Sequence, residues 1–178
     1  MKKKIIMVTG GQRSGKSEFA EELAMRLGEK PVYMATARVM DKEFEARVER
    51  HRSRRGPQWT TIEEPLLLSR HNLTGRVVLI DCVTLWATNT FFDAGEDADA
   101  AMNRLAAEFE EFTSRAATYI FVTNEIGLGG VSENPLTRRF TDLQGNINRL
   151  IASRADEVYL VVSGIPVKIK SQFNNENL

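Results

Sequence analysis

The chain has 178 residues, with 24 Lys and Arg against 24 Asp and Glu and a formal net charge of zero. This length suits one compact domain and is short for two, and the balanced charge gives no overall attraction to nucleic acid or to a membrane surface. The single cysteine, Cys82, excludes an internal disulfide and fits a reducing compartment.

The first predicted element is a strand over Lys4–Val8. The N-terminus, Met-Lys-Lys-Lys, resembles the start of a signal peptide, but the apolar run that follows ends after a few residues in a glycine-rich loop. No stretch of the chain approaches the ~20 apolar residues of a membrane span. We therefore expect a cytoplasmic protein without a membrane span.

The loop after this strand has the spacing of a phosphate-binding loop, and a predicted helix over Lys16–Leu27 follows it. Glycines let backbone N–H groups converge there, and the helix dipole favours an anion at the same point. We expect Lys16 to act in catalysis by reaching the β- and γ-phosphates, and the Ser17 hydroxyl suits a bridging Mg²⁺. The alternative is a glycine turn that binds nothing, but eight residues in register favour a nucleoside triphosphate site. The expected nucleotide contacts are Gly10, Gly11, Gln12, Arg13, Ser14, Gly15, Lys16 and Ser17.

Apolar runs alternate with helical patterns along the rest of the chain, which predicts an α/β fold. We expect a P-loop NTPase-type domain over 1–170, with a mostly parallel sheet flanked by helices. A tight turn at Ser163-Gly164 predicts an antiparallel C-terminal edge strand over Val167–Lys170, and the tail 171–178 is expected to be disordered. The other predicted strands are Val32–Ala35, Val77–Asp81, Tyr119–Thr123 and Glu157–Val162, and the other helices are Asp41–Arg54, Thr84–Phe92, Asp97–Arg115 and Pro135–Arg154.

Asp81 ends a strand that is apolar throughout, Val77–Ile80. If the phosphate loop lies at the carboxyl ends of the strands, this carboxylate is close to a bound Mg²⁺ and holds it through water. The alternative is an acid that merely terminates a buried strand, and the phosphate loop favours the metal role. Cys82 beside it is interpreted as a packing residue.

His51 lies in the helix Asp41–Arg54, with Arg47 four residues before it and Arg54 and Arg55 three and four residues after it. Such positions share a helix face, and neighbouring guanidiniums disfavour the protonated imidazole. A neutral imidazole beside cations suits nucleophilic attack on a phosphate. From the charge pattern alone, a solvated basic face with an incidental histidine is the stronger interpretation. An arginine lid of a small-molecule kinase is another alternative, and a nucleic-acid patch is disfavoured because the net charge is zero and no aromatic residues are interleaved.

Two later segments are candidates for a role at the site. Residues 123–130 follow a strand at the expected edge, where polar groups and glycines approach substrates closely, although an ordinary flexible loop fits equally. On the following helix, the polar residues are expected to be solvated, and His71 is expected at the surface or at a helix end. These helix residues are Arg138, Arg139, Asp142 and Asn148.

Several segments match one family in order and spacing. Beyond the phosphate loop, the more specific ones are Val122-Thr123-Asn124-Glu125 and Val162-Ser163-Gly164 followed by Val167-Lys168-Ile169-Lys170. With these segments the chain resembles, over nearly its whole length, the bifunctional adenosylcobinamide kinase / adenosylcobinamide-phosphate guanylyltransferase of cobalamin biosynthesis. Departures are small: the helix opening around Pro135 varies and the Asn-rich tail is extra.

The resemblance implies two transferase reactions. Adenosylcobinamide is phosphorylated with ATP or GTP, and GMP is then transferred from GTP to that phosphate through a guanylyl-histidine, giving adenosylcobinamide-GDP and pyrophosphate. His51 matches the position of that histidine, and the resemblance also implies a homotrimer acting on small molecules. Further nucleotide contacts implied by the resemblance are Ala35, Thr36, Ala37, Arg52, Ser53, Arg54, Arg55, Glu63 and Asp81.

Two other functions fit parts of the pattern. One is a monofunctional small-molecule kinase with an arginine-rich lid, and the other is a non-enzymatic binding module gated by nucleotide. Under the bifunctional hypothesis, Glu125 is a candidate for the base that accepts the proton of the corrinoid hydroxyl.

Overall fold

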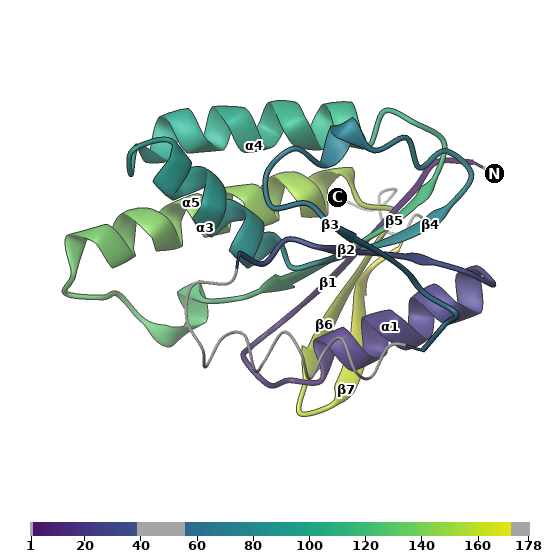
Figure 1. Cartoon of the computed structure of the whole chain (residues 1–178). Helices are drawn as coiled ribbons and strands as arrows, with labels where there is room; N and C mark the ends of the chain where they lie inside the picture. Colours follow the sequence, from purple (N-terminus) through teal and green to yellow (C-terminus); the bar gives the residue numbers. More distant parts are fainter. Residues whose placement is uncertain (1, 39–55, 172–178) are drawn as a thin grey trace.

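The computed structural model describes residues 2–38 and 56–171. Its strands and helices alternate along the chain, as predicted (Figure 1). The strands are β1 (Lys4–Gly10), β2 (Val32–Ala35), β3 (Thr60–Glu63), β4 (Val77–Asp81), β5 (Thr118–Asn124), β6 (Glu157–Val162) and β7 (Ile165–Lys170). The helices are α1 (Lys16–Leu27), α3 (Val83–Asp93), α4 (Ala98–Phe112) and α5 (Pro135–Arg154), with short 3₁₀ helices η1 (Leu68–Arg70) and η2 (Gly127–Gly129).

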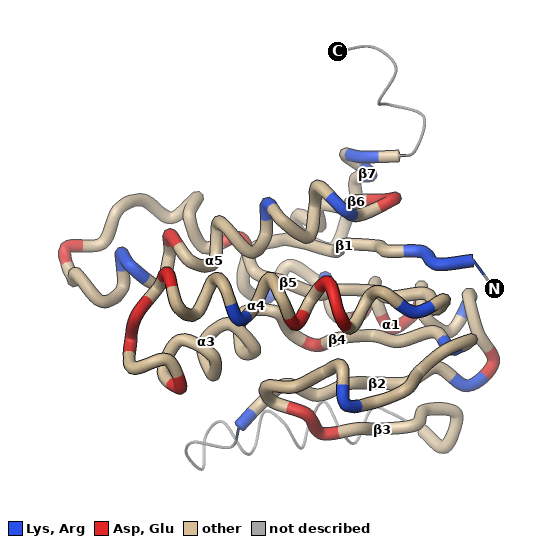
Figure 2. The backbone as a smooth tube through the Cα atoms, turned by 90° about the horizontal axis from the view of Figure 1, so that it is seen from above, with Lys and Arg blue, Asp and Glu red and all other residues tan. Residues whose placement is uncertain are grey.

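The seven strands form one sheet in the order β3-β2-β4-β5-β1-β6-β7, which Figure 2 shows from above. Every neighbouring pair is parallel except β6 and β7, which are antiparallel. The predicted fold class is therefore confirmed, including the antiparallel edge strand. Because parallel strands share one direction, their carboxyl ends meet along one edge of the sheet.

The sheet separates two apolar cores. Along β1, Ile5 and Met7 belong to the core that α3, α4 and α5 cover, while Ile6 and Val8 belong to the core that α1 covers. Figure 1 shows these helices on opposite faces of the sheet. This alternation follows from the two-residue period of a strand, and burial on both faces explains why the strand is apolar throughout.

Side-chain caps fix where two helices begin. The Asp97 carboxylate accepts hydrogen bonds from the first turn of α4, and the Asn134 side chain does the same for α5, which begins at Pro135. None of the helices in the described ranges combines the length and apolar character that crossing a membrane requires.

Three predicted boundaries were wrong or incomplete. The strand β3 was not predicted, because it is a short, half-exposed edge strand with little apolar pattern. The helix α4 ends at Phe112 rather than Arg115, since the Thr113 hydroxyl and the Ser114 hydroxyl bond back to the last carbonyls. The strand β7 begins at Ile165, two residues earlier than predicted. The predicted helix Asp41–Arg54 lies outside the described residues.

Candidate active site

The predicted nucleotide contacts of four strands lie along the carboxyl edge of the sheet. In the strand register, Glu63 pairs with Ala35, and Ala35 pairs with Asp81. On the other side, Gly10 at the end of β1 pairs with Asn124 at the end of β5. Residues separated by more than one hundred positions in sequence, Gly10 and Asn124, are therefore brought to one edge by the strand order.

The loop from Gly10 to Gly15 forms a compact turn, and α1 begins directly after it at Lys16. Gly15 adopts a left-handed conformation (φ 89°), and the Lys16 ammonium donates to the Gly11 carbonyl at 2.9 Å. No side chain of the described residues caps the first turn of α1, and the buried Ser14 hydroxyl has no partner among them. Free N–H groups and a hydroxyl at a helix N-terminus suit an anion.

Close contacts require glycine at two positions of this loop, Gly10 and Gly15. A Cβ on Gly10 would lie 2.5 Å from the Val161 carbonyl oxygen, and one on Gly15 would lie 3.2 Å from the Cα of Gly164. The Gly164 amide also donates to the Ser14 carbonyl at 2.8 Å. The tight turn between β6 and β7 thus packs directly against the phosphate loop and supports it, a contact that the sequence did not predict.

Lys16 is buried, with 8% of its surface exposed. This burial lowers the pKa of its ammonium, while the nearby Cys82 and Asp81 groups act in the opposite direction. A positive charge held partly out of water gains more from a bound phosphate than an exposed one does. The position of Lys16 fits its predicted role.

Asp81 is oriented by a side chain that sequence reasoning missed. The Tyr33 hydroxyl donates a hydrogen bond to Asp81 Oδ2, and the buried Tyr33 ring packs edge-on against Trp59 with 5.8 Å between ring centres.

The Cys82 thiol lies next to Asp81. Burial and the Asp81 carboxylate raise the pKa of this thiol to about 12, so it is not a nucleophile at neutral pH. This supports the interpretation of Cys82 as a packing residue.

The donor set at this edge fits a magnesium ion. Ser17 offers a hydroxyl and Asp81 a carboxylate, which are the hard oxygen ligands that Mg²⁺ prefers. No group of three or more His, Cys, Asp or Glu side chains in the described ranges could hold a metal by itself. Such an arrangement suits an ion that arrives with nucleotide phosphates, because Mg²⁺ is commonly bound by one or two protein ligands plus phosphate oxygens.

The predicted contact at Thr36 has a structural role as well. Its hydroxyl donates to the Cys82 carbonyl at 2.8 Å and accepts from the Cys82 amide at 2.9 Å, while its own carbonyl accepts from Asn89 at 2.7 Å. Thr36 therefore ties the end of β2 to the residue that follows Asp81. Ala37 lies next to it, partly buried, and Glu63 is exposed at the end of β3.

His51 and Arg52 to Arg55 lie outside the described residues. Their predicted roles, as nucleophile and as nucleotide contacts, are neither supported nor contradicted by the geometry. His71 ends η1, as predicted for a helix-end residue.

One expectation for α5 was wrong. Asn148 was expected to be solvated, but it is buried with 5% exposure and bonds to the Thr123 hydroxyl at 2.7 Å. The reason lies in its spacing, since Asn148 adjoins Ile147 and Ile151 on the apolar face of the helix. Arg138 and Arg139 are exposed, as expected. The signal that was overlooked is a pair of amides, Gln144 and Asn148, four residues apart on a buried face.

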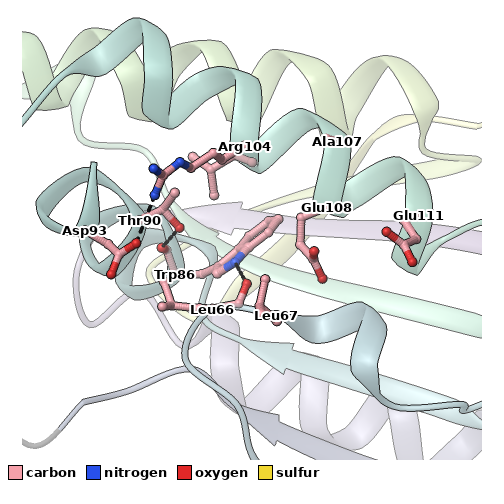
Figure 3. Close-up of a pocket in the computed structure, with 10 residues that line it drawn as sticks. Leu66, Leu67, Trp86, Thr90, Asp93, Arg104, Ala107, Glu108 and Glu111 are labelled. Carbon is pink, nitrogen blue, oxygen red and sulfur yellow. Dashed lines mark hydrogen bonds and ion pairs between the residues drawn. The ribbon is translucent and has the colours of Figure 1, made fainter. Parts of the chain in front are cut away.

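A cavity of about 340 Å³ lies away from this edge, between α3, α4 and the segment after β3 (Figure 3). Its wall contains the buried Trp86, whose indole N–H donates to the Leu66 carbonyl at 3.0 Å. The Arg104 guanidinium at its rim is paired with Asp93 at 2.9 Å. None of the residues that line it is a predicted site residue.

Comparison with known proteins gave consistent matches. The family described as "Cobinamide kinase / cobinamide phosphate guanyltransferase" matches residues 6–169. The bifunctional adenosylcobalamin biosynthesis protein CobU of Escherichia coli (strain K12) is 41% identical, over 93% of this chain and 99% of its own. The bifunctional adenosylcobalamin biosynthesis protein CobP of Pseudomonas aeruginosa is 39% identical, over 93% of this chain and 97% of its own. A distant similarity in structure, with a TM-score of 0.49 and 14% identity, links the chain to the flagellar accessory protein FlaH from Methanocaldococcus jannaschii, covering 96% of this chain and 79% of that one.

Proposed function

Since the chain belongs to the cobinamide kinase / cobinamide phosphate guanyltransferase family, we propose that it phosphorylates adenosylcobinamide and then transfers GMP from GTP to the new phosphate. The observation that carries this proposal is the phosphate loop itself, with Lys16 buried at the start of α1 and the Asp81 carboxylate nearby. Phosphoryl transfer requires mainly positioning and neutralisation of charge, and these residues supply both.

In the first reaction, the hydroxyl oxygen of the aminopropanol arm attacks the γ-phosphorus of ATP or GTP. The bond between the γ-phosphorus and the bridging oxygen breaks, and the nucleoside diphosphate leaves with that electron pair. Lys16 neutralises charge on the β- and γ-phosphates, and Glu125 accepts the hydroxyl proton. Ser17 and Asp81 hold Mg²⁺, which supplies further charge neutralisation when bound.

In the second reaction, a nitrogen of the His51 imidazole attacks the α-phosphorus of GTP. A P–N bond forms, the bond to the bridging oxygen breaks, and pyrophosphate leaves. A phosphate oxygen of adenosylcobinamide phosphate then attacks the same phosphorus and breaks the P–N bond, which releases adenosylcobinamide-GDP. This assignment rests on the family resemblance and on the arginines around His51 in the sequence, because neighbouring cations favour the neutral, nucleophilic imidazole.

The remaining nucleotide contacts are proposed on the same ground. They are Gly10 to Ser17, Ala35, Thr36, Ala37, Arg52, Ser53, Arg54, Arg55, Glu63 and Asp81.

We also propose that the protein is cytoplasmic and forms a homotrimer. An exposed apolar row on the β6–β7 hairpin, Val162, Ile165, Val167 and Ile169, supports association between subunits. Sedimentation should give about three times the chain mass of 20.1 kDa, and a monomer would reject the trimer.

The function is tested by incubating the purified protein with GTP, Mg²⁺ and adenosylcobinamide and resolving the products by mass. We expect adenosylcobinamide phosphate first, and then adenosylcobinamide-GDP together with pyrophosphate. If adenosylcobinamide phosphate accumulates and no adenosylcobinamide-GDP forms, the protein is a monofunctional kinase. Unchanged adenosylcobinamide, with a folded protein that binds GTP, would reject both activities.

A further inference from the structure

The strand β5 extends beyond its neighbour β4 at the carboxyl edge. Asp81, the last residue of β4, pairs with Val122, whereas β5 continues through Thr123 to Asn124. In the sheet, β5 lies between β4 and β1. The end of β5 therefore lies between the Asp81 strand and the phosphate loop, where a transferred phosphate must be handled.

Side chains from two helices replace the sheet partner that β4 no longer provides. The Asn124 amide N–H and its side-chain NH₂ both donate to the Thr84 hydroxyl oxygen of α3, each at 3.1 Å. Its carbonyl accepts from the Asn148 side chain of α5 at 3.1 Å. The next amide, that of Glu125, donates to the Gly10 carbonyl at 3.1 Å. The extension is thus held by two helices, α3 and α5, and tied to Gly10, the first residue of the phosphate loop.

Behind Asn124 lies a buried network of polar side chains. The Thr123 hydroxyl donates to Asn148 Oδ1 at 2.7 Å, and the Gln144 side-chain NH₂ donates to both, at 3.0 and 2.9 Å. Thr123 and Gln144 are fully buried and Asn148 nearly so. Gln144 Oε1 is buried and has no partner among the described residues.

Such a network is an expensive way to pack a helix against a sheet. A buried acceptor left unsatisfied destabilises the fold, and apolar side chains would fill the same positions without that penalty. The group that the network holds in the site is Asn124. The loss of stability that comes with the buried network is explained if the placement of Asn124 matters for the reaction.

We propose that Thr123, Gln144 and Asn148 are positioning residues, which together with Thr84 fix Asn124 and Glu125 between the phosphate loop and Asp81 for phosphoryl transfer. This inference rests on the proposed kinase reaction. Placement errors of about 1 Å can lower a rate by up to about 100-fold without abolishing binding. Loss of the network should therefore lower kcat far more than it weakens nucleotide affinity.

The activity test compares Thr123→Val, which removes the hydroxyl at nearly constant volume, with Thr123→Ser, which keeps it. Ile147→Val, a truncation at a fully buried position of α5, controls for lost stability. We expect kcat for phosphorylation of adenosylcobinamide to fall roughly 10- to 100-fold in Thr123→Val, with the Kd for GTP changed less than about threefold. Thr123→Ser and Ile147→Val should stay near the parent. Equal kcat in all three folded variants would overturn the proposal, whereas an inactive parent would reject the proposed function instead.

A second measurement does not depend on activity. Amide hydrogen exchange over 118–128 should be faster in Thr123→Val than in Thr123→Ser, because Asn124 and Glu125 lose their support, while exchange over β1 residues 5–8 stays slow. The partly exposed Thr84 provides a second pair, Thr84→Val and Thr84→Ser, for which folding is less at risk. Unchanged exchange at 124–125 in both valine variants would refute the positioning role whatever the activity.

Discussion

At the scale of the residue, Lys16 combines a functional position with an unfavourable environment. Its ammonium is removed from water at the start of α1, and this burial lowers its pKa from an ordinary value near 10.5. Because the folded-state pKa is lower than the unfolded one, the unfolded chain binds the proton more tightly. The charge therefore destabilises the free protein at neutral pH, and the penalty disappears as pH rises above the unfolded value.

Replacing the buried charge should consequently stabilise the protein while removing its function. We expect Lys16→Met to raise the free energy of unfolding by about 1 kcal/mol at pH 7, since a buried charge is replaced by an apolar side chain of similar length. Binding of GTP should be lost. Urea unfolding and calorimetric titration measure the two effects, and a less stable Lys16→Met protein would contradict the argument.

Glu157, unlike Lys16, stabilises the fold in its charged form. Burial alone would raise its pKa, but hydrogen bonds from Lys4, Tyr159 and Lys168 lower it to about 2. A carboxyl with a folded-state pKa below its ordinary value of 4.5 stabilises the fold above that value. This contribution is lost as pH falls from about 4.5 to about 2.

We expect Glu157→Gln to lower the free energy of unfolding by about 1 kcal/mol at pH 7, after allowance for the partial exposure of its lysine partners. The difference from the parent should shrink steadily as pH falls from about 4.5 to about 2, as the parent carboxyl becomes protonated. Glu110→Gln is a suitable control, because its pair with Arg154 is exposed and should contribute less than about 0.5 kcal/mol. A difference that is constant with pH would exclude the electrostatic explanation.

At the scale of the element, the β6–β7 hairpin serves the active site from the edge of the sheet. Its turn residue Gly164 has a φ of 83° and donates to the Ser14 carbonyl inside the phosphate loop. Only a residue that tolerates a left-handed backbone keeps this contact without strain.

Gly164→Ala should therefore loosen the phosphate loop as well as strain the turn. Gly75→Ala is a matched control, because Gly75 has a φ of 78°, has equally open space around its Cα, and lies in the turn before β4. Both variants should lose about 1 kcal/mol of stability. Only Gly164→Ala should bind GTP more weakly, and equal affinities in fluorescence or calorimetric titrations would show that the hairpin contact is incidental.

The elements also show what a sequence reveals and what it hides. Continuous apolar runs predicted β1, β4 and β5, and a contiguous motif predicted the phosphate loop, because both signals are local. The strand β3 was missed since four half-exposed residues carry little pattern. The buried amide pair Gln144 and Asn148 could have been recognised on α5, but its connection to Thr123 and, through Asn124, to Thr84 could not, because these residues meet only once α3 and α5 pack against the end of β5.

At the scale of the whole molecule, the larger apolar core and the proposed nucleotide site lie in different parts of the sheet. One face, under α3, α4 and α5, holds the larger core and the buried network, while the carboxyl edge collects the residues proposed to contact the nucleotide. This division lets one site perform transfer of a γ-phosphate and transfer of a nucleotidyl group, provided that a nucleophile reaches the α-phosphate. The proposed nucleophile is His51.

Covalent labelling with GTP that carries ³²P at the α-position tests this directly. The parent protein with Mg²⁺ should retain label in an acid-labile, base-stable bond, as expected for a phosphoramidate, and GTP labelled at the γ-position should leave none. His51→Ala should lose the label and still phosphorylate adenosylcobinamide. Label that persists in His51→Ala, or a parent that transfers GMP to the corrinoid without ever becoming labelled, would contradict the histidine relay.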